Sequence, residues 1–221
     1  MSVEPWDALD RYFAERLLAG DRGMDAVLAA NEAAGLPAID VSPLQGKLLH
    51  LIARIAGARR VLEIGTLGGY STIWLARAVG PQGEVVTIEH QTGHARIAQA
   101  NIVRAGLADR VDIRIGAALD LLPRIEAERR GPFDLVFIDA DKASQDLYLA
   151  WGVRLSRPGT VIIGDNVVRD GEVIDGASEN PAVQGIRRFI DLLAAEPRLS
   201  ATIIQTVGSK GWDGFAIAVV D

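Results

Sequence analysis

Two acids and a lysine follow one apolar run of the chain within four positions. The run LVFI (135–138) leads directly into Asp139, and Asp141 and Lys142 come next. Carboxylates that crowd the end of a buried strand repel each other and lose hydration, which costs free energy unless a cation compensates them. A cation site would explain this arrangement, but taken alone the run is more simply read as the solvated mouth of a loop.

A second pair of oxygen donors, Asp165 and Asn166, follows the apolar run TVIIG (160–164). Taken alone, an Asp-Asn pair after a strand is often a turn that bonds its own backbone, and the Asp-x-Asp-Lys run is often a solvated loop. If the two strands are neighbours, however, Asp139, Asp165 and Asn166 converge. Oxygen donors without Cys or His suit Mg²⁺, Mn²⁺ or Ca²⁺ better than zinc.

A glycine-rich turn, EIGTLGGYS (63–71), follows another apolar run, and an acid, Glu89, ends the next one. The spacing of the glycines is not G-x-G-x-x-G, so a dinucleotide pyrophosphate fits poorly. Glycines still let the backbone approach a ligand, and an acid about 20 residues further on can accept ribose hydroxyls. The ligand that best matches these features is S-adenosylmethionine, which has a ribose but no phosphate. The structural alternative is that the glycines only form a turn and that Glu89 only caps a helix.

These residues need a parallel sheet to bring them together. Short apolar runs alternate with helical periodicity, as expected for a doubly wound α/β sheet covered on both faces. The expected strands are 60–65, 84–89, 110–116, 133–139 and 160–165. In such a sheet, ligands bind outside the carboxyl ends of the strands, where these polar residues lie.

The two ends of the chain depart from this alternation. The first 57 residues read mainly as helices, and the C-terminal segments 201–207 and 215–221 read as an antiparallel hairpin joined by GSKGWDG. We predict a single domain, with a helical extension over 1–57 and a cofactor- and metal-binding core over 58–221. Trp212, in the predicted hairpin turn, is expected to be more exposed than the other tryptophans and to line a substrate pocket or an interface, with burial as the equal alternative.

Composition excludes several classes of protein. The 221 residues contain no cysteine, which excludes disulfides, thiolate metal sites and cysteine nucleophiles. The net charge of −6 argues against a broad nucleic-acid surface. The N-terminus does not resemble a signal peptide and no apolar run is long enough for a membrane span, so we expect a cytoplasmic protein. His90 and His94 lie on the cofactor side without a third ligand, which argues against a metal role.

The blocks VLEIGTLGGYSTIWLA, GAALDLLP, FDLVFIDADK and IIGDN, together with Glu89, resemble the cation-dependent S-adenosylmethionine O-methyltransferases. The similarity is greatest to the caffeoyl-CoA O-methyltransferase type and more distant to catechol O-methyltransferase, and it covers roughly residues 38–221. It implies a class I methyltransferase fold, with a Rossmann-like sheet, and a homodimer.

The resemblance also implies roles for individual residues. Those implied to contact the cofactor are Val41 and Ala118 at its two ends, Glu63, Gly65, Thr66 and Gly69 in the turn, Ser71 at the methionyl carboxylate, Glu89 at the ribose, and Asp139. The implied metal ligands are Asp139, Asp165 and Asn166. Lys142 takes the place of the catalytic lysine, with a salt bridge to Asp141 as its structural alternative. Asp141 lies on the substrate side or makes a structural hydrogen bond.

The sequence thus predicts a metal-dependent O-methyltransferase, with Mg²⁺ as the expected cation, that acts on one hydroxyl of a catechol-like small molecule. A methyltransferase with a different acceptor, an NAD-dependent oxidoreductase and a cofactor-binding protein without catalysis are the alternatives. The substrate loops, near 167–181 and in the N-terminal helices, show no match from which a CoA thioester acceptor could be inferred.

Overall fold

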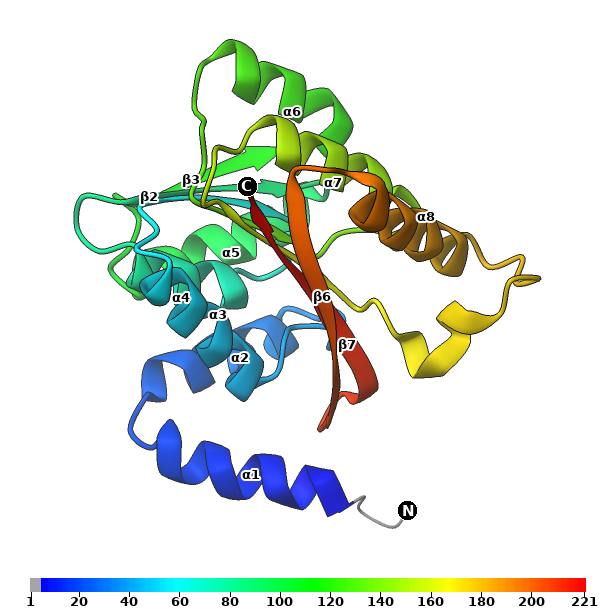
Figure 1. The fold of residues 1–221 in the computed structure, drawn as a ribbon. Coiled ribbons are helices and arrows are strands. Elements are labelled where there is room, and N and C mark those ends of the chain that lie inside the picture. Colours follow the sequence, from blue (N-terminus) through cyan, green and yellow to red (C-terminus); the bar gives the residue numbers. More distant parts are fainter. Residues whose placement is uncertain (1–4) are drawn as a thin grey trace.

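The computed structural model describes residues 5–221, which contain one seven-stranded sheet with helices on both faces (Figure 1). The strands are β1 (Arg60–Ile64), β2 (Glu84–Glu89), β3 (Val111–Ile115), β4 (Leu135–Ile138), β5 (Val161–Asp165), β6 (Leu199–Gly208) and β7 (Gly211–Val220). The helices are α1 (Pro5–Leu17), α2 (Arg22–Ala33), α3 (Pro43–Ile55), α4 (Tyr70–Ala78), α5 (Thr92–Arg104), α6 (Ala118–Ala127), α7 (Gln145–Arg154) and α8 (Pro181–Ala195), with 3₁₀ turns η1 (Lys142–Ser144) and η2 (Arg169–Ile174). The expected doubly wound α/β fold is confirmed.

The strand order is β3-β2-β1-β4-β5-β7-β6, and all pairs from β3 to β5 are parallel. The chain moves outward from β1 through β2 to β3 and then returns to place β4 on the other side of β1. The order therefore reverses between β1 and β4, where ligands bind in sheets of this kind. Glu63, Asp139 and Lys142 all lie at or near this point.

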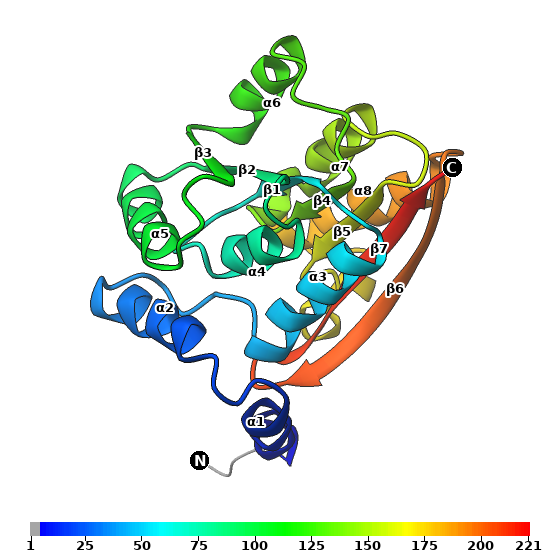
Figure 2. The ribbon, with the colours of Figure 1, turned by 90° about the vertical axis from the view of Figure 1, so that its left-hand side faces the viewer.

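Two separate cores cover the sheet. On one face, α4 and α5 pack against the strands, α3 packs on α4, and α2 packs on α4 and α5, with buried apolar side chains such as Val27, Leu49 and Ile73. On the other face, α6 to α8 do the same with residues such as Leu122 and Phe189. Figure 2 shows the two helical layers on either side of the sheet. Because β1 and β4 are buried on both faces, their apolar runs lack the alternation of a half-exposed strand.

The C-terminal hairpin is longer than its apolar segments predicted. β6 and β7 pair from Leu199 with Val220 to Gly208 with Gly211, so the turn contains only Ser209 and Lys210. Trp212 therefore lies in β7, opposite Val207, and its predicted position in the turn is wrong. Its side chain is 43% exposed, in line with the predicted exposure. The extended hairpin reaches past the sheet and contacts α1 (Figures 1 and 2).

The expected helical N-terminus is confirmed as α1, α2 and α3. Ser42 caps the start of helix α3, since its Oγ accepts the backbone N–H of Gln45, and Pro43 is the first residue of the helix. The start of this helix is therefore fixed by its sequence. The division of the chain at residue 57 stays a prediction. Over residues 5–221, no helix is both long and apolar enough to cross a membrane.

Candidate active site

Two cavities open at the carboxyl ends of the parallel strands. The larger, of about 660 Å³, lies over the ends of β1, β2 and β4, and the other, of about 540 Å³, lies between α3, η2 and the β6–β7 hairpin. We call them the β1 cavity and the hairpin cavity. They share part of their lining, namely Ile39, Asp40, Val41, Asp139, Asn166 and Arg169.

Most of the residues that the sequence assigned to the cofactor line the β1 cavity. They are Val41, Gly65, Thr66, Ser71, Glu89, Ala118 and Asp139. Gly65 has a φ of 104°, and a Cβ there would lie 2.2 Å from the backbone oxygen of Asp139, so glycine is required where β1 passes β4.

Glu89 is placed to accept hydroxyl groups inside this cavity. Its Oε2 accepts the backbone N–H of Leu67 at 2.8 Å and its Oε1 accepts that of Gln91 at 2.8 Å. These bonds fix the rotamer of the carboxylate, and each oxygen keeps a further lone pair. His94 approaches Oε1 at 3.6 Å from the same side, and both His90 and His94 line the β1 cavity.

Glu63 and Gly69 do not line the β1 cavity but lie beneath its surface. The Glu63 side chain is completely buried and accepts hydroxyl hydrogens from Ser71 at 2.6 Å, Thr72 at 2.5 Å and Thr87 at 2.6 Å. Burial raises the pKa of Glu63 to about 7, although the three hydroxyls act in the opposite direction. Glu63 thus ties β1 to β2 and α4, and Gly69 caps α4 with a φ of 84°.

The hydroxyl of Ser71 is directed toward Glu63 and away from the predicted methionyl carboxylate. Ser71 lies in the first turn of α4, where backbone N–H groups have no partner within the helix. An anion in the β1 cavity could therefore be bound by these N–H groups and by the helix dipole.

Asp139 and Asp165 lie side by side at the ends of adjacent parallel strands. Ile138 is in register with Gly164, so the next residues, Asp139 and Asp165, face each other across a strand spacing of about 4.8 Å. Both of them, and Asn166, line the hairpin cavity. The structure therefore brings together the three side chains that the sequence assigned to a metal.

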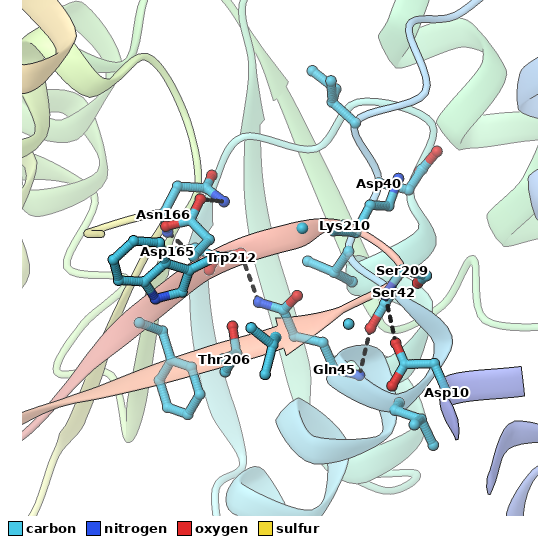
Figure 3. A pocket seen from close by; sticks show the side chains of 18 of the residues that line it. Asp10, Asp40, Ser42, Gln45, Asp165, Asn166, Thr206, Ser209, Lys210 and Trp212 are labelled. Atoms are coloured by element: carbon cyan, nitrogen blue, oxygen red, sulfur yellow. Dashed lines mark hydrogen bonds between the residues drawn. The ribbon is translucent and has the colours of Figure 1, made fainter. Parts of the chain in front are cut away.

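The environment of Asp165 fits a divalent cation. The residue is only 4% exposed, and burial, followed by the negative charge of Asp139, raises the pKa of Asp165 to about 7. Its Oδ2 accepts the side-chain N–H of Gln45 at 2.8 Å and its Oδ1 the backbone N–H of Asn166 at 2.9 Å, which leaves lone pairs on both oxygens (Figure 3). A cation would remove the cost of placing two carboxylates here.

Within residues 5–221, no three His, Cys, Asp or Glu side chains are grouped so that they could hold a metal ion. A site at Asp139 and Asp165 consequently depends on the amide oxygen of Asn166 as its third protein donor. Mg²⁺ commonly binds through one or two carboxylates and completes its shell with water or substrate oxygens. The donor set therefore fits an ion of this kind.

Lys142 contacts Asp139 and not Asp141. Its Nζ donates to Asp139 Oδ1 at 2.8 Å, and its side chain is only 10% exposed, so the structural alternative of a salt bridge to Asp141 is wrong. Asp141 instead caps η1 by accepting the Ser144 N–H at 3.0 Å, and it accepts the hydroxyl of Tyr148. Asp141 has a structural role in this geometry, and it also lines the β1 cavity.

Sequence reasoning missed three residues of the site. Gln45 reaches Asp165 from α3, and Asp213 of β7 bonds to Asn166, while Tyr148 holds Asp141. Gln45 and Asp213 are separated from their partners by 120 and 47 residues along the chain. Only Tyr148, seven residues after Asp141 on the following helix, had a local signal that could have found it.

Comparison with known proteins adds the following similarities. The family model described as O-methyltransferase matches residues 24–216. A catechol O-methyltransferase of Mycobacterium tuberculosis is 53% identical over 96% of this chain and 94% of that protein. A catechol O-methyltransferase of Niastella koreensis is 50% identical, with 100% of both chains covered. The crystal structure of an O-methyltransferase from Bacillus cereus in complex with SAH is 60% identical, with a TM-score of 0.98 and 100% of both chains covered.

Proposed function

Because the chain belongs to the O-methyltransferase family, we propose that it is an S-adenosylmethionine- and divalent-metal-dependent enzyme that methylates one hydroxyl of a catechol-like vicinal diol. One observation carries the proposal: Asp139 and Asn166, two of the three candidate metal ligands, line both cavities, so a metal here would lie where the two cavities meet. A methyl donor in the β1 cavity and an acceptor in the hairpin cavity would meet at this point.

The β1 cavity suits S-adenosylmethionine. The related Bacillus cereus protein was crystallised with SAH, the demethylated form of this donor. Glu89 offers acceptor oxygens for the ribose hydroxyls, and the start of α4 offers N–H groups to the methionyl carboxylate. Ala118 lines the same cavity and would pack against the adenine. The NAD-dependent alternative loses its basis, since the family is an O-methyltransferase family and the glycine spacing does not suit a pyrophosphate.

When bound, the donor would supply a methyl group on a sulfonium, and the cation at Asp139, Asp165 and Asn166 would stabilise a phenolate and orient it. Ionising a phenol of pKa about 10 at pH 7 costs about 4 kcal/mol, and this cost is what the site must offset. Lys142 Nζ, which donates to Asp139 Oδ1, would in its neutral form be the group of this chain that accepts the proton of the acceptor hydroxyl. The cavity walls position the two reactants.

The charge of the hairpin cavity supports a small acceptor and argues against a CoA thioester. The acidic residues that line it are Asp10, Asp40, Asp139, Asp165, Asp170, Glu172 and Asp213, and the basic residues are Arg169 and Lys210. A divalent cation would offset only two of the negative charges. The several phosphate charges of CoA would therefore be repelled, whereas a neutral or amine-bearing diol would not.

The proposal is tested by incubating the protein with S-adenosylmethionine labelled in the methyl group and a panel of acceptors. We expect label in catechols, little in monophenols or caffeoyl-CoA, and none after treatment with EDTA. Mg²⁺ or Mn²⁺ should restore the reaction, because the cation both stabilises the phenolate and chelates the second oxygen. Full activity in the chelated protein would exclude the metal, and the absence of label from every vicinal diol would exclude the acceptor class.

We also propose that the chain forms a homodimer through α1, α3 and β6. Helix α1 has no buried residue, and β6 is an edge strand that is exposed along most of its length. The exposed apolar side chains on these elements are Leu9, Tyr12, Phe13, Leu17, Leu48, Leu51, Ile55, Ile203, Ile204 and Val207. An apolar surface and an unpaired edge of this kind are normally covered by a partner.

Light scattering on the purified protein is expected to give twice the mass of one chain. Phe13→Asp should shift the mass toward that of a monomer, since it places a charge in the apolar surface. Val103→Asp, at an exposed apolar position on α5, is the matched control and should stay dimeric. A monomeric wild-type protein would contradict the proposal.

A further inference from the structure

Asp213 connects the end of β7 to the segment that follows β5. Its Oδ1 accepts three backbone N–H groups, from Val168 at 3.1 Å, Arg169 at 3.0 Å and Gly214 at 2.9 Å. Its Oδ2 accepts the side-chain amide hydrogen of Asn166, with Nδ2 at 3.1 Å. The antiparallel register, in which Asp165 faces Phe215, places Asp213 beside this segment.

The segment held by Asp213 has an unusual backbone. Asn166, Arg169 and Asp170 have φ values of 56°, 54° and 53°, a region that residues other than glycine rarely adopt. Such conformations persist only where surrounding contacts impose them, and they occur frequently at ligand sites. The bonds from Val168 and Arg169 to Asp213 are contacts of this kind.

The bond to Asn166 determines which end of its amide faces the cavities. A carboxylate oxygen can only accept hydrogen bonds, so the group directed at Asp213 must be the NH₂ of Asn166. The amide is planar, and its Oδ1 therefore points away from Asp213. If the amide were turned over, its N–H donors would take the place of this oxygen at the cavity that Asp139 and Asp165 also line, and they would repel a cation bound there.

We infer that Asp213 is a positioning residue for the metal site, because it fixes the Asn166 amide with the oxygen toward the cation. This inference rests on the proposed metal site but adds a residue that does not itself contact the ion. Groups that orient metal ligands typically change metal affinity by about 10- to 100-fold when they are replaced. Asp213 would be the partner that makes an asparagine usable as the third donor.

The two functions of Asp213, holding the loop and orienting the amide, are separated by Asp213→Asn. The new Oδ1 can still accept the backbone N–H groups of Val168 and Arg169, but its NH₂ would face the NH₂ of Asn166. Asn166 must then turn its oxygen toward residue 213 and its N–H groups toward the metal. The double variant Asn166→Asp with Asp213→Asn restores a donor–acceptor pair and leaves the net charge unchanged.

Mn²⁺ binding to the purified protein, measured by isothermal titration calorimetry, provides a readout that does not depend on catalysis. We expect Asp213→Asn to weaken Mn²⁺ binding by about 10- to 100-fold. The double variant, which also places a third carboxylate on the cation, should bind Mn²⁺ at least as tightly as the wild type. Asp175→Asn is the matched control. Its carboxylate caps the backbone N–H of Ala177 in the same loop region, and it should bind Mn²⁺ as the wild type does.

SAH binding and the melting temperature of each variant show whether the protein is folded. Wild-type Mn²⁺ affinity in folded Asp213→Asn would overturn the inference and leave the proposed function intact. Weak binding that the double variant does not restore would also overturn it, because it would indicate a role in loop structure alone. A wild-type protein that binds no Mn²⁺ would overturn the metal site and this inference together.

Discussion

Replacing Asp139 with alanine is expected to lower kcat for methyl transfer to a catechol by about 10³-fold at pH 7. Asp139 is one of two carboxylates in the proposed metal site, and without the cation the phenol must be ionised unaided, at a cost of about 4 kcal/mol. Steady-state kinetics with saturating Mg²⁺ would measure the loss. Mn²⁺ titration should show weakened binding at the same time.

The same variant should bind S-adenosylmethionine with an affinity within a few-fold of the wild type, because we propose that Glu89 and the start of α4, elsewhere in the β1 cavity, hold the ribose and the methionyl carboxylate. Glu89→Ala is the reciprocal control. It should weaken cofactor binding and leave Mn²⁺ binding unchanged, since Glu89 lies at the end of β2 and bonds to Leu67 and Gln91. An undiminished rate in Asp139→Ala would remove this residue from the site.

Replacing Lys142 with methionine is expected to reduce kcat by about 10²-fold or more, the usual contribution of a positioned general base. Methionine keeps much of the length of the lysine side chain but cannot accept a proton.

Lys142 also differs from Asp139 in the effect that its replacement should have on metal binding. Its Nζ donates to Asp139 Oδ1, so it competes with a cation for this oxygen. Lys142→Met should therefore bind Mn²⁺ as tightly as the wild type, or more tightly.

Lys142→Arg separates the charge of the lysine from its ability to accept a proton. Arginine keeps the positive charge beside Asp139 but stays protonated in proteins, so this variant should be as slow as Lys142→Met. Pre-steady-state measurement of the methyl-transfer step would ensure that product release does not hide the effect. If Lys142→Arg retained most of the wild-type rate, Lys142 would be an electrostatic residue and not a base.

The sequence predicted the parallel part of the fold well because its signals are local. Each of β1, β2, β4 and β5 is a short apolar run followed by a helical period, and strands buried on both faces need such runs. The β6–β7 hairpin was less predictable. Its strands extend into the polar segment GSKGWDG, where pairing across the hairpin outweighs the turn propensity of the residues, and this places Trp212 in a strand.

Candidate ligands could be identified from sequence where they follow strands directly, as Asp139 and Asp165 do. Their supporting contacts could not, because Gln45 and Asp213 come from distant parts of the chain whose approach depends on packing. For Glu63, in contrast, the residue could be identified from the sequence but its role could not. The family resemblance implied a cofactor contact, but three hydroxyls from β2 and α4 enclose Glu63 beneath the cavity.

The amino-acid sequence by itself determined the strand–helix alternation, the glycine at which β1 passes β4, and the types of side chain at the strand ends, since each depends on neighbours in the chain. The tertiary structure decided which side chains meet and how they are oriented. The register of β4 with β5 sets Asp139 beside Asp165, and the register of β5 with β7 brings Asp213 to Asn166. Such pairings depend on hydrogen bonds between distant strands, which no local pattern specifies.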